Sequence, residues 1–182
     1  RDGTLTATAP NSVTMTEVNE APEITSNLGF KISLGIDENT TAVTTITASD
    51  VDLGATLKYS LVAGSDSALF SIDENTGVLS FQNSTDYEQK LDAGSDNIYD
   101  VRVQVSDGTL TDTQDVSVKV NDVNETPVLT TNNGLTVNAP VAENSTSVTT
   151  ITASDLDAGS VLSYSISGGV DAAPFAINAA TG

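Results

Sequence analysis

The chain repeats its own sequence at a constant spacing, and this feature constrains its fold most. Asp2–Thr6 recurs as Asp107–Thr111, and Glu38-Asn39 recurs as Glu143-Asn144, so that matching positions are 105 residues apart. No insertion or deletion separates the copies. A repeat of this length has the size of one domain. The 182 residues are therefore predicted to hold the end of one repeat in residues 1–21, a complete repeat in 22–126, and the first part of a further repeat in 127–182.

The complete repeat is predicted to contain only β-strands. Tyr99, Val101, Val103 and Val105 alternate with polar residues, which is typical of a strand with one buried face. No segment has the apolar period of a helix. Seven strands in about 100 residues indicate an all-β fold, a seven-stranded Greek-key β-sandwich, repeated in tandem. The expected strands are Phe30–Leu34, Val43–Ala48, Leu57–Val62, Phe70–Ile72, Val78–Phe81, Ile98–Val105 and Thr111–Val120.

Charge excludes two classes of partner. Asp and Glu number 25 against 6 Lys and Arg, which gives a formal net charge of −19. Such a chain repels nucleic-acid phosphates and anionic membrane surfaces. The segment also has no apolar run long enough for membrane insertion, and no signal peptide is recognised in it.

Carboxylates are concentrated in short D-x-D and D-x-E motifs that lie near predicted strand ends. Asp50 and Asp52 form one pair, Asp86 and Glu88 a second, and Asp155 with its partner Asp157 repeats the first. Side chains two residues apart share a face, so each pair presents its oxygens together. Ca²⁺ takes about 6–8 oxygen ligands, whereas zinc, copper and iron–sulfur sites need the His or Cys that this sequence lacks. The motifs therefore predict calcium sites.

These motifs, in this order and spacing, resemble cadherin repeats, and in particular their bacterial relatives in large secreted adhesins. The resemblance covers the whole chain. It rests on Glu38-Asn39, Ala48-Ser49-Asp50-Val51-Asp52, Phe70-Ser71-Ile72-Asp73, Thr76-Gly77, Asp86-Tyr87-Glu88, Ser106-Asp107-Gly108 and Asp122-Val123-Asn124-Glu125-Thr126-Pro127. The sequence departs from the animal pattern in two ways: Glu20 and Glu125 stand where Asp is usual, and Tyr87 stands where Arg is usual.

The resemblance implies that calcium binds between successive repeats. At the junction after the complete repeat, the implied ligands are Glu38, Asp86, Glu88, the Val123 carbonyl, Glu125 and Asp157, with Asn124, the Thr126 carbonyl and Asp155 joining Asp157 at a further ion. At the preceding junction they are Asn19, the Ala21 carbonyl, Asp50, Asp52 and Asp107. The polar segment Gln89–Asn97, with Asp92 and Asp96, is expected to be a solvated loop, with an ion of its own as the alternative.

The implied function is structural. Calcium would lock neighbouring repeats of one chain into a stiff rod that supports cell adhesion by a secreted or membrane-associated adhesin. The alternatives left open are a calcium-dependent carbohydrate- or protein-binding module, including homophilic or polysaccharide ligands, and a non-catalytic spacer of a large secreted enzyme. Paired carboxylates also occur in glycosidases. However, the sequence has no His, no Trp and no Ser-His-Asp or Cys-His set, so no catalytic residue is predicted.

Overall fold

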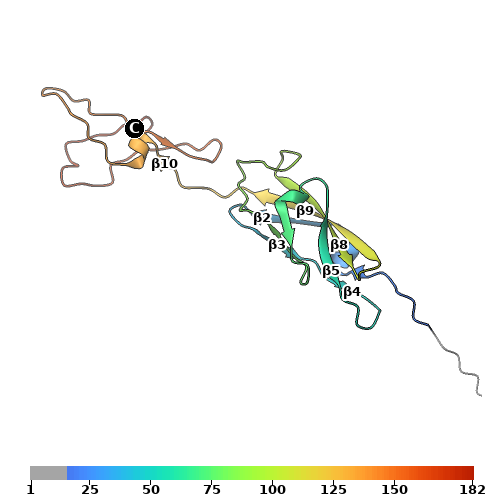
Figure 1. The fold of residues 1–182 in the computed structure, drawn as a ribbon. Coiled ribbons are helices and arrows are strands. Elements are labelled where there is room, and N and C mark those ends of the chain that lie inside the picture. Colours follow the sequence, from blue (N-terminus) through green and yellow to red (C-terminus); the bar gives the residue numbers. More distant parts are fainter. Residues whose placement is uncertain (1–15) are drawn as a thin grey trace, which may run out of the picture.

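The computed structural model describes residues 16–182, so most of the predicted segment 1–21 lies outside the described residues. The complete repeat is a two-layer β-sandwich (Figure 1). Its strands are β1 (Glu23–Ile24), β2 (Ile32–Asp37), β3 (Ala42–Thr45), β4 (Ala48–Ser49), β5 (Lys58–Val62), β6 (Phe70–Ile72), β7 (Val78–Phe81), β8 (Ile98–Ser106) and β9 (Thr111–Asn121). One layer is four-stranded, in the order β2-β9-β8-β5, and the other is three-stranded, in the order β3-β7-β6. The predicted seven-stranded sandwich is thus confirmed, with the short strand β1 added and one predicted strand divided into β3 and β4.

The core lies between the two sheets and is built from the alternating strands. β8 and β9 are antiparallel and pair Val101 with Val116. The four residues of β8 that the alternation predicts to face inward are buried, and so are Val116, Val118 and Val120 of β9. Phe81 packs against Phe70 at a ring-centroid distance of 4.3 Å and meets the edge of Tyr99 at 5.1 Å. Period-two alternation therefore identified the buried face correctly.

One predicted strand is divided in the structure. The run Val43–Ala48 was expected to be continuous, but β3 ends at Thr45, and β4 pairs with β1 rather than with β7. Ile46 lies between them, fully buried, and its N–H donates to the carbonyl of Gly77 at 2.9 Å. The chain therefore changes partners at this point, and sequence alternation does not reveal such a change because both halves remain extended.

The turn between β6 and β7 forms as the Asp73–Gly77 sequence predicts. One Asp73 carboxylate oxygen accepts hydrogen bonds from the N–H groups of Asn75 (2.9 Å) and Thr76 (2.8 Å). Gly77 has φ +68°, and a Cβ there would collide with the carbonyl oxygen of Ile46. Only glycine combines this backbone conformation with so close an approach.

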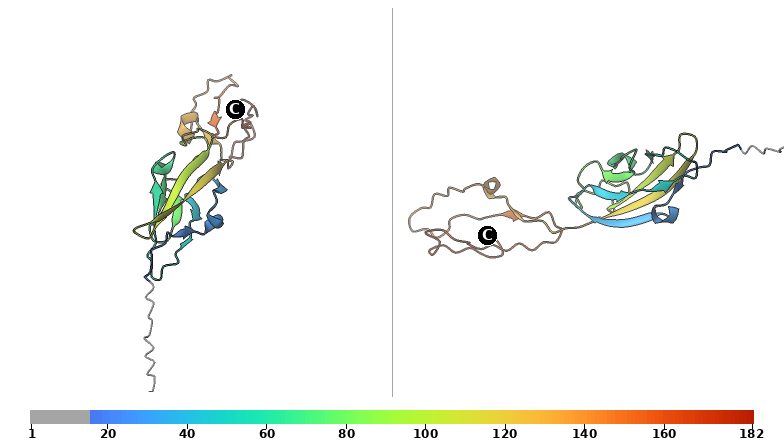
Figure 2. Two further views of the ribbon diagram at one scale, coloured as in Figure 1. Left: turned by 90° about the vertical axis from the view of Figure 1, so that its right-hand side faces the viewer. Right: turned by 90° about the horizontal axis from the view of Figure 1, so that it is seen from below.

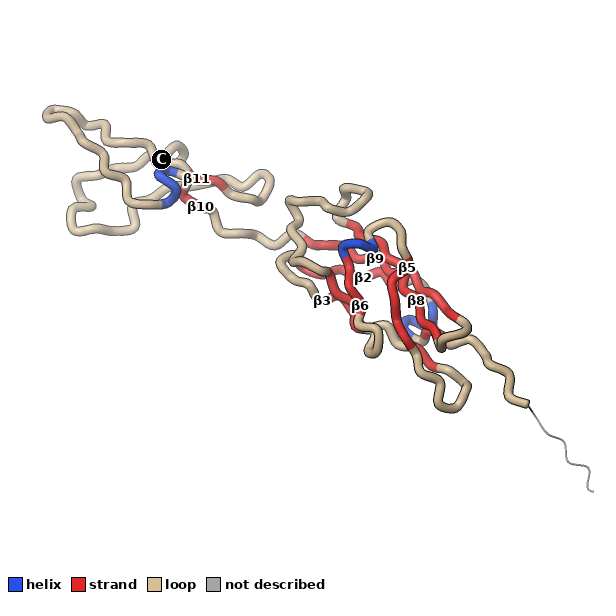
Figure 3. Tube along the Cα trace, in the orientation of Figure 1, coloured by secondary structure: helices blue, strands red, loops and turns tan. Residues whose placement is uncertain are grey.

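Residues 127–182 reproduce the beginning of the complete repeat. β10 (Val128–Leu129), the 3₁₀ turn η3 (Thr131–Gly134) and β11 (Ala153–Ser154) lie 105 positions after β1, η1 (Ser26–Gly29) and β4. The rest of this part is irregular (Figure 3), and among its described residues the only strand pairing is that of β10 with β11. The two parts lie end to end and are joined by one extended connection (Figure 2).

Helical structure is limited to single 3₁₀ turns in the described part of the chain. They are η1, η2 (Ser67–Leu69) and η3. Among residues 16–182, no helix has the length and apolar character needed to cross a membrane.

Candidate metal centre at the repeat junction

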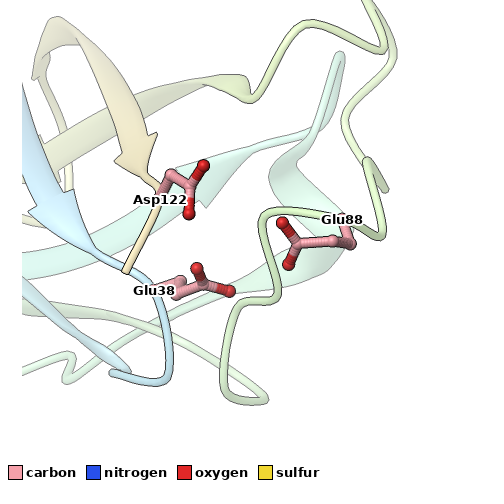
Figure 4. Close-up of side chains that lie close together, drawn as sticks. All are labelled: Glu38, Glu88 and Asp122. Atoms are coloured by element: carbon pink, nitrogen blue, oxygen red, sulfur yellow. The ribbon is translucent and has the colours of Figure 1, made fainter. Parts of the chain in front are cut away.

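Three carboxylates converge at the end of the sandwich from which the chain leaves for the next repeat. Glu38 follows β2, Asp122 follows β9, and Glu88 lies in the loop after β7. One oxygen of each lies within 4.8 Å of the others, and their side chains point toward a common space (Figure 4). Sequence reasoning included Glu38 and Glu88 but left out Asp122, although the junction run Asp122–Pro127 contains it.

The buried carboxylate of Glu38 organises this end of the sandwich. Only 3% of the Glu38 surface is exposed, and its two oxygens accept hydrogen bonds from the N–H groups of Tyr87 (2.8 Å) and Val123 (2.9 Å). Hydrogen bonds to an ionised carboxylate are stronger than neutral ones. Glu38 therefore fixes the D-x-E loop and the start of the junction segment relative to each other.

A second cluster joins the two repeats. Oxygens of Glu88, Glu125 and Asp157 also lie within 4.8 Å of one another, and Asp157 belongs to the segment after the junction. The N–H of Glu125 donates to Asp157 at 2.9 Å, and the side-chain amide of Asn39 donates to Glu125 at 3.3 Å. Glu88 belongs to both clusters, so its carboxylate lies between the sites on either side.

The electrostatics of these clusters favour a cation. Glu88 and Glu125 each have one buried carboxylate oxygen, Oε2, without a hydrogen-bond partner. Loss of solvation, followed by the negative charges of Glu38 and Asp122, raises the pKa of Glu88 above its ordinary value. Loss of solvation and the charges of Glu38 and Asp157 raise the pKa of Glu125 in the same way. A bound divalent cation would remove this repulsion and occupy the unpartnered oxygens.

The donor set fits a hard cation such as Ca²⁺. All the converging side-chain atoms are carboxylate oxygens, and calcium accepts carboxylate, carbonyl and water oxygens in irregular arrangements. The unpartnered oxygens of Glu88 and Glu125 are the observation that the fit depends on, because exposed acidic residues alone are common. Glu38, Glu88, Asp122, Glu125 and Asp157 would hold the ion or ions, which would supply charge neutralisation and a bridge between repeats.

Other predicted ligands take supporting positions in the described residues. One Asp86 oxygen accepts from the N–H groups of Glu88 (3.0 Å) and Gln89 (3.1 Å), so Asp86 shapes the D-x-E loop. Asp155 does the same for Asp157, whose N–H it accepts at 3.0 Å. The Asn124 side chain donates to the Glu125 carbonyl at 2.9 Å. No contact of the Ala21, Val123 or Thr126 carbonyl oxygen is identified among the described residues, so their role as ligands stays a prediction.

The preceding junction repeats part of this geometry. The N–H of Glu20 donates to Asp52 at 2.9 Å, the same contact and distance as Glu125 with Asp157. The Asn19 amide donates to Asp107 at 2.7 Å, and Asp50 has a buried unpartnered oxygen. The N–H groups of Leu110 and Thr109, together with Asn19, lower the pKa of Asp107. The predicted residues Asn19, Asp50, Asp52 and Asp107 are thus gathered at one end of the sandwich.

Comparison with known families and relatives relates the chain to cadherins. Residues 32–121 match the model of the cadherin domain. The chain is 32% identical to human Protocadherin Fat 1 over 98% of its length, and 29% identical to chicken Cadherin-7 over 94%. It spans only 4% of the first protein and 23% of the second. The relatives named here are animal proteins, so they do not test the likeness to bacterial adhesins.

Solved structures with the same architecture are cadherin ectodomains. Extracellular cadherin domains 3–6 of Protocadherin Gamma B2 superpose with a TM-score of 0.53 at 26% identity, covering 92% of this chain and 44% of that one. The EC1-2 segment of human Protocadherin-24 gives a TM-score of 0.54 at 25% identity, covering 82% of this chain and 67% of that one. Both comparisons therefore extend beyond the complete repeat into the segment after the junction.

Proposed function

We propose that this chain is a non-catalytic, calcium-stiffened segment of an adhesion rod, because residues 32–121 match the cadherin-domain model. Calcium is the cation that the oxygen-only donor set favours. The ion would bridge carboxylates of successive repeats and so restrict their relative motion.

The observation that carries this proposal is the cluster of Glu88, Glu125 and Asp157. It combines side chains from both sides of the junction, so that occupancy by one cation would couple the two repeats. Without the cation, the charges of Glu38, Glu88 and Asp122 would repel one another at short range. Extracellular modules bind Ca²⁺ at roughly 10⁻⁴–10⁻³ M, so the junction would be filled outside the cell and empty inside it.

The adhesive role is proposed for the rod as a whole, either through its reach or through contacts between copies. On the sequence resemblance, we favour a bacterial secreted or membrane-associated adhesin as the protein to which this segment belongs. Carbohydrate binding has less support, because there is no Trp and four of the eight aromatic residues, Tyr59, Phe70, Phe81 and Tyr99, are buried in the core. A spacer in a larger enzyme would use the same calcium junction.

Calcium titration of wild-type protein and an Asp157→Asn variant tests the bridge. Asn keeps the size of the side chain but removes a negative ligand that the second repeat supplies, so affinity is expected to fall about tenfold, or ~1.4 kcal/mol. Asp171→Asn, an exposed position in the same segment, is the matched control and should bind like the wild type. Equal affinities for wild type and Asp157→Asn would contradict a bridge between repeats.

A further inference from the structure

The segment between Glu88 and β8 is the exposed loop that its composition predicts at seven of its nine residues, but Asp92 and Asn97 within it are buried. Only 4% of the Asp92 surface is exposed, and its oxygens accept hydrogen bonds from the N–H groups of Asp96 (2.9 Å) and Asn97 (3.0 Å). Burial alone would raise the pKa of Asp92, but these N–H groups outweigh it and lower the pKa. Asp92 therefore folds Gln89–Asn97 around its own carboxylate.

The same segment is attached to the sandwich by a second buried carboxylate. Asp66, of which 5% is exposed, accepts hydrogen bonds from the N–H groups of Ala93 (2.7 Å) and Asp100 (2.8 Å). Ala93 lies within the loop and Asp100 lies within β8, so one side chain holds both. Two buried carboxylates, each with both oxygens occupied, define a rigid element rather than a mobile one.

Asn97 connects this rigid element to the metal centre. Its side chain is 1% exposed and donates through Nδ2 to the Tyr87 carbonyl at 2.9 Å, which belongs to the peptide bond that joins Tyr87 to Glu88. Its own carbonyl accepts the N–H of Val120 at 2.9 Å, two residues before Asp122. Tyr87 in turn donates its N–H to Glu38 at 2.8 Å. Asn97 thus contacts the chain segments that carry Glu88 and Asp122 directly, and it is linked to Glu38 through Tyr87.

Asn97 occupies this place at a cost to stability. Its Oδ1 is buried without a partner, and its backbone has φ +63°, a left-handed conformation that few residues other than Gly and Asn adopt readily. Glycine or a hydrophobic residue would avoid the unpartnered oxygen. The amide is therefore useful for what it donates, namely the hydrogen bond to Tyr87.

We propose that Asn97 is a positioning residue of the junction metal site. It does not touch the ion. Asp92 and Asp66 hold the loop that carries Asn97. Asn97 in turn fixes the Tyr87–Glu88 peptide against the end of β9, so that the carboxylates of Glu88 and Asp122 are held at the spacing the cation needs. This inference rests on the proposed calcium-binding function.

The substitution Asn97→Gly tests this role. Glycine keeps the left-handed backbone and removes only the amide, so the Tyr87–Glu88 peptide would lose its fixed position. Loss of a residue that orients metal ligands typically lowers affinity 10–100-fold, so calcium affinity is expected to fall at least about tenfold in a calorimetric titration. The matched control is Asn27→Gly, because Asn27 also has positive φ and donates to a backbone carbonyl, that of Lys31 at 2.9 Å. The control should bind calcium like the wild type.

Thermal unfolding separates positioning from general stability. A merely structural Asn97 would lower the melting temperature equally with calcium and with chelator, whereas a positioning role reduces the gap between the two conditions. If Asn97→Gly does not fold, Asp92→Asn decides the question, because it leaves Asn97 in place but weakens its support; a smaller loss of affinity is expected. Wild-type affinity in a folded variant overturns this inference alone, whereas a wild-type chain that takes up no calcium overturns the proposed function and the inference together.

Discussion

Replacing Glu38 by glutamine is expected to weaken calcium binding at the junction at least about tenfold and to destabilise the complete repeat even in chelator. Both effects follow from the double role of this carboxylate. It belongs to the Glu38–Glu88–Asp122 cluster, and it accepts the N–H groups of Tyr87 and Val123. Glutamine offers one acceptor oxygen, so its NH₂ group would face one of these two donors.

The stability loss is expected at about 1–3 kcal/mol, the cost of a buried donor left without an acceptor. Relief of repulsion from Glu88 and Asp122 offsets only part of it, because neither of those residues is fully buried. Urea unfolding in chelator and calcium titration measure the two effects separately. Glu23→Gln, at an exposed position of β1, is the control and should change neither. A Glu38→Gln variant with wild-type stability and affinity would contradict the account of this site.

The stability of the complete repeat is expected to depend on pH in opposite directions with and without calcium. In chelator, the raised pKa values of Glu88 and Glu125 mean that the folded junction binds more protons than the unfolded chain. The free energy of unfolding therefore rises as the pH falls from 7 toward the ordinary value of 4.5. With calcium the carboxylates must be ionised, so lowering the pH weakens binding and removes stability.

At pH 7 and about 10 mM Ca²⁺, each bound ion is expected to add about 1.4–2.7 kcal/mol to the free energy of unfolding, given the affinity range of extracellular modules.

Asp92 and Asp107 have lowered pKa values and act in a separate pH window. They stabilise the fold above the ordinary pKa of 3.8, and that stability is lost as the pH falls below it. Urea unfolding between pH 7 and 5, followed by circular dichroism, measures how the free energy of unfolding changes with pH in calcium and in chelator. Glu88→Gln should make the slope in chelator shallower, and equal slopes with and without calcium would contradict a cation at this junction.

The strands of the sandwich could be predicted from the sequence where every second residue is buried. Val101, Val103 and Val105 of β8 alternate with polar residues, and the sandwich follows from such strands. The short strands β1 and β4 were not predicted correctly, because a two-residue pairing depends on where Ile46 is buried rather than on a local pattern.

The candidate site was predictable from its motifs but not in its details. The D-x-E and D-x-D motifs identified Glu88 and Asp157, since residue type and spacing determine which oxygens face the same way. Asp122 was missed because neighbouring acidic residues in the junction run do not reveal which side chain turns toward Glu38. The burial of Asp92 was also missed, since it depends on backbone N–H groups, which composition does not report.

The most direct test of calcium as the lock between repeats is small-angle X-ray scattering on two tandem copies of residues 22–126, with calcium and with chelator. Asp50 and Asp52 of the second copy occupy the positions of Asp155 and Asp157, so the junction is preserved. A stiff rod is expected with calcium. With chelator, the distance distribution should broaden and the maximum dimension should change, and Glu38→Gln in the first copy should resemble chelator at limiting calcium. Identical scattering profiles in both conditions would contradict the account.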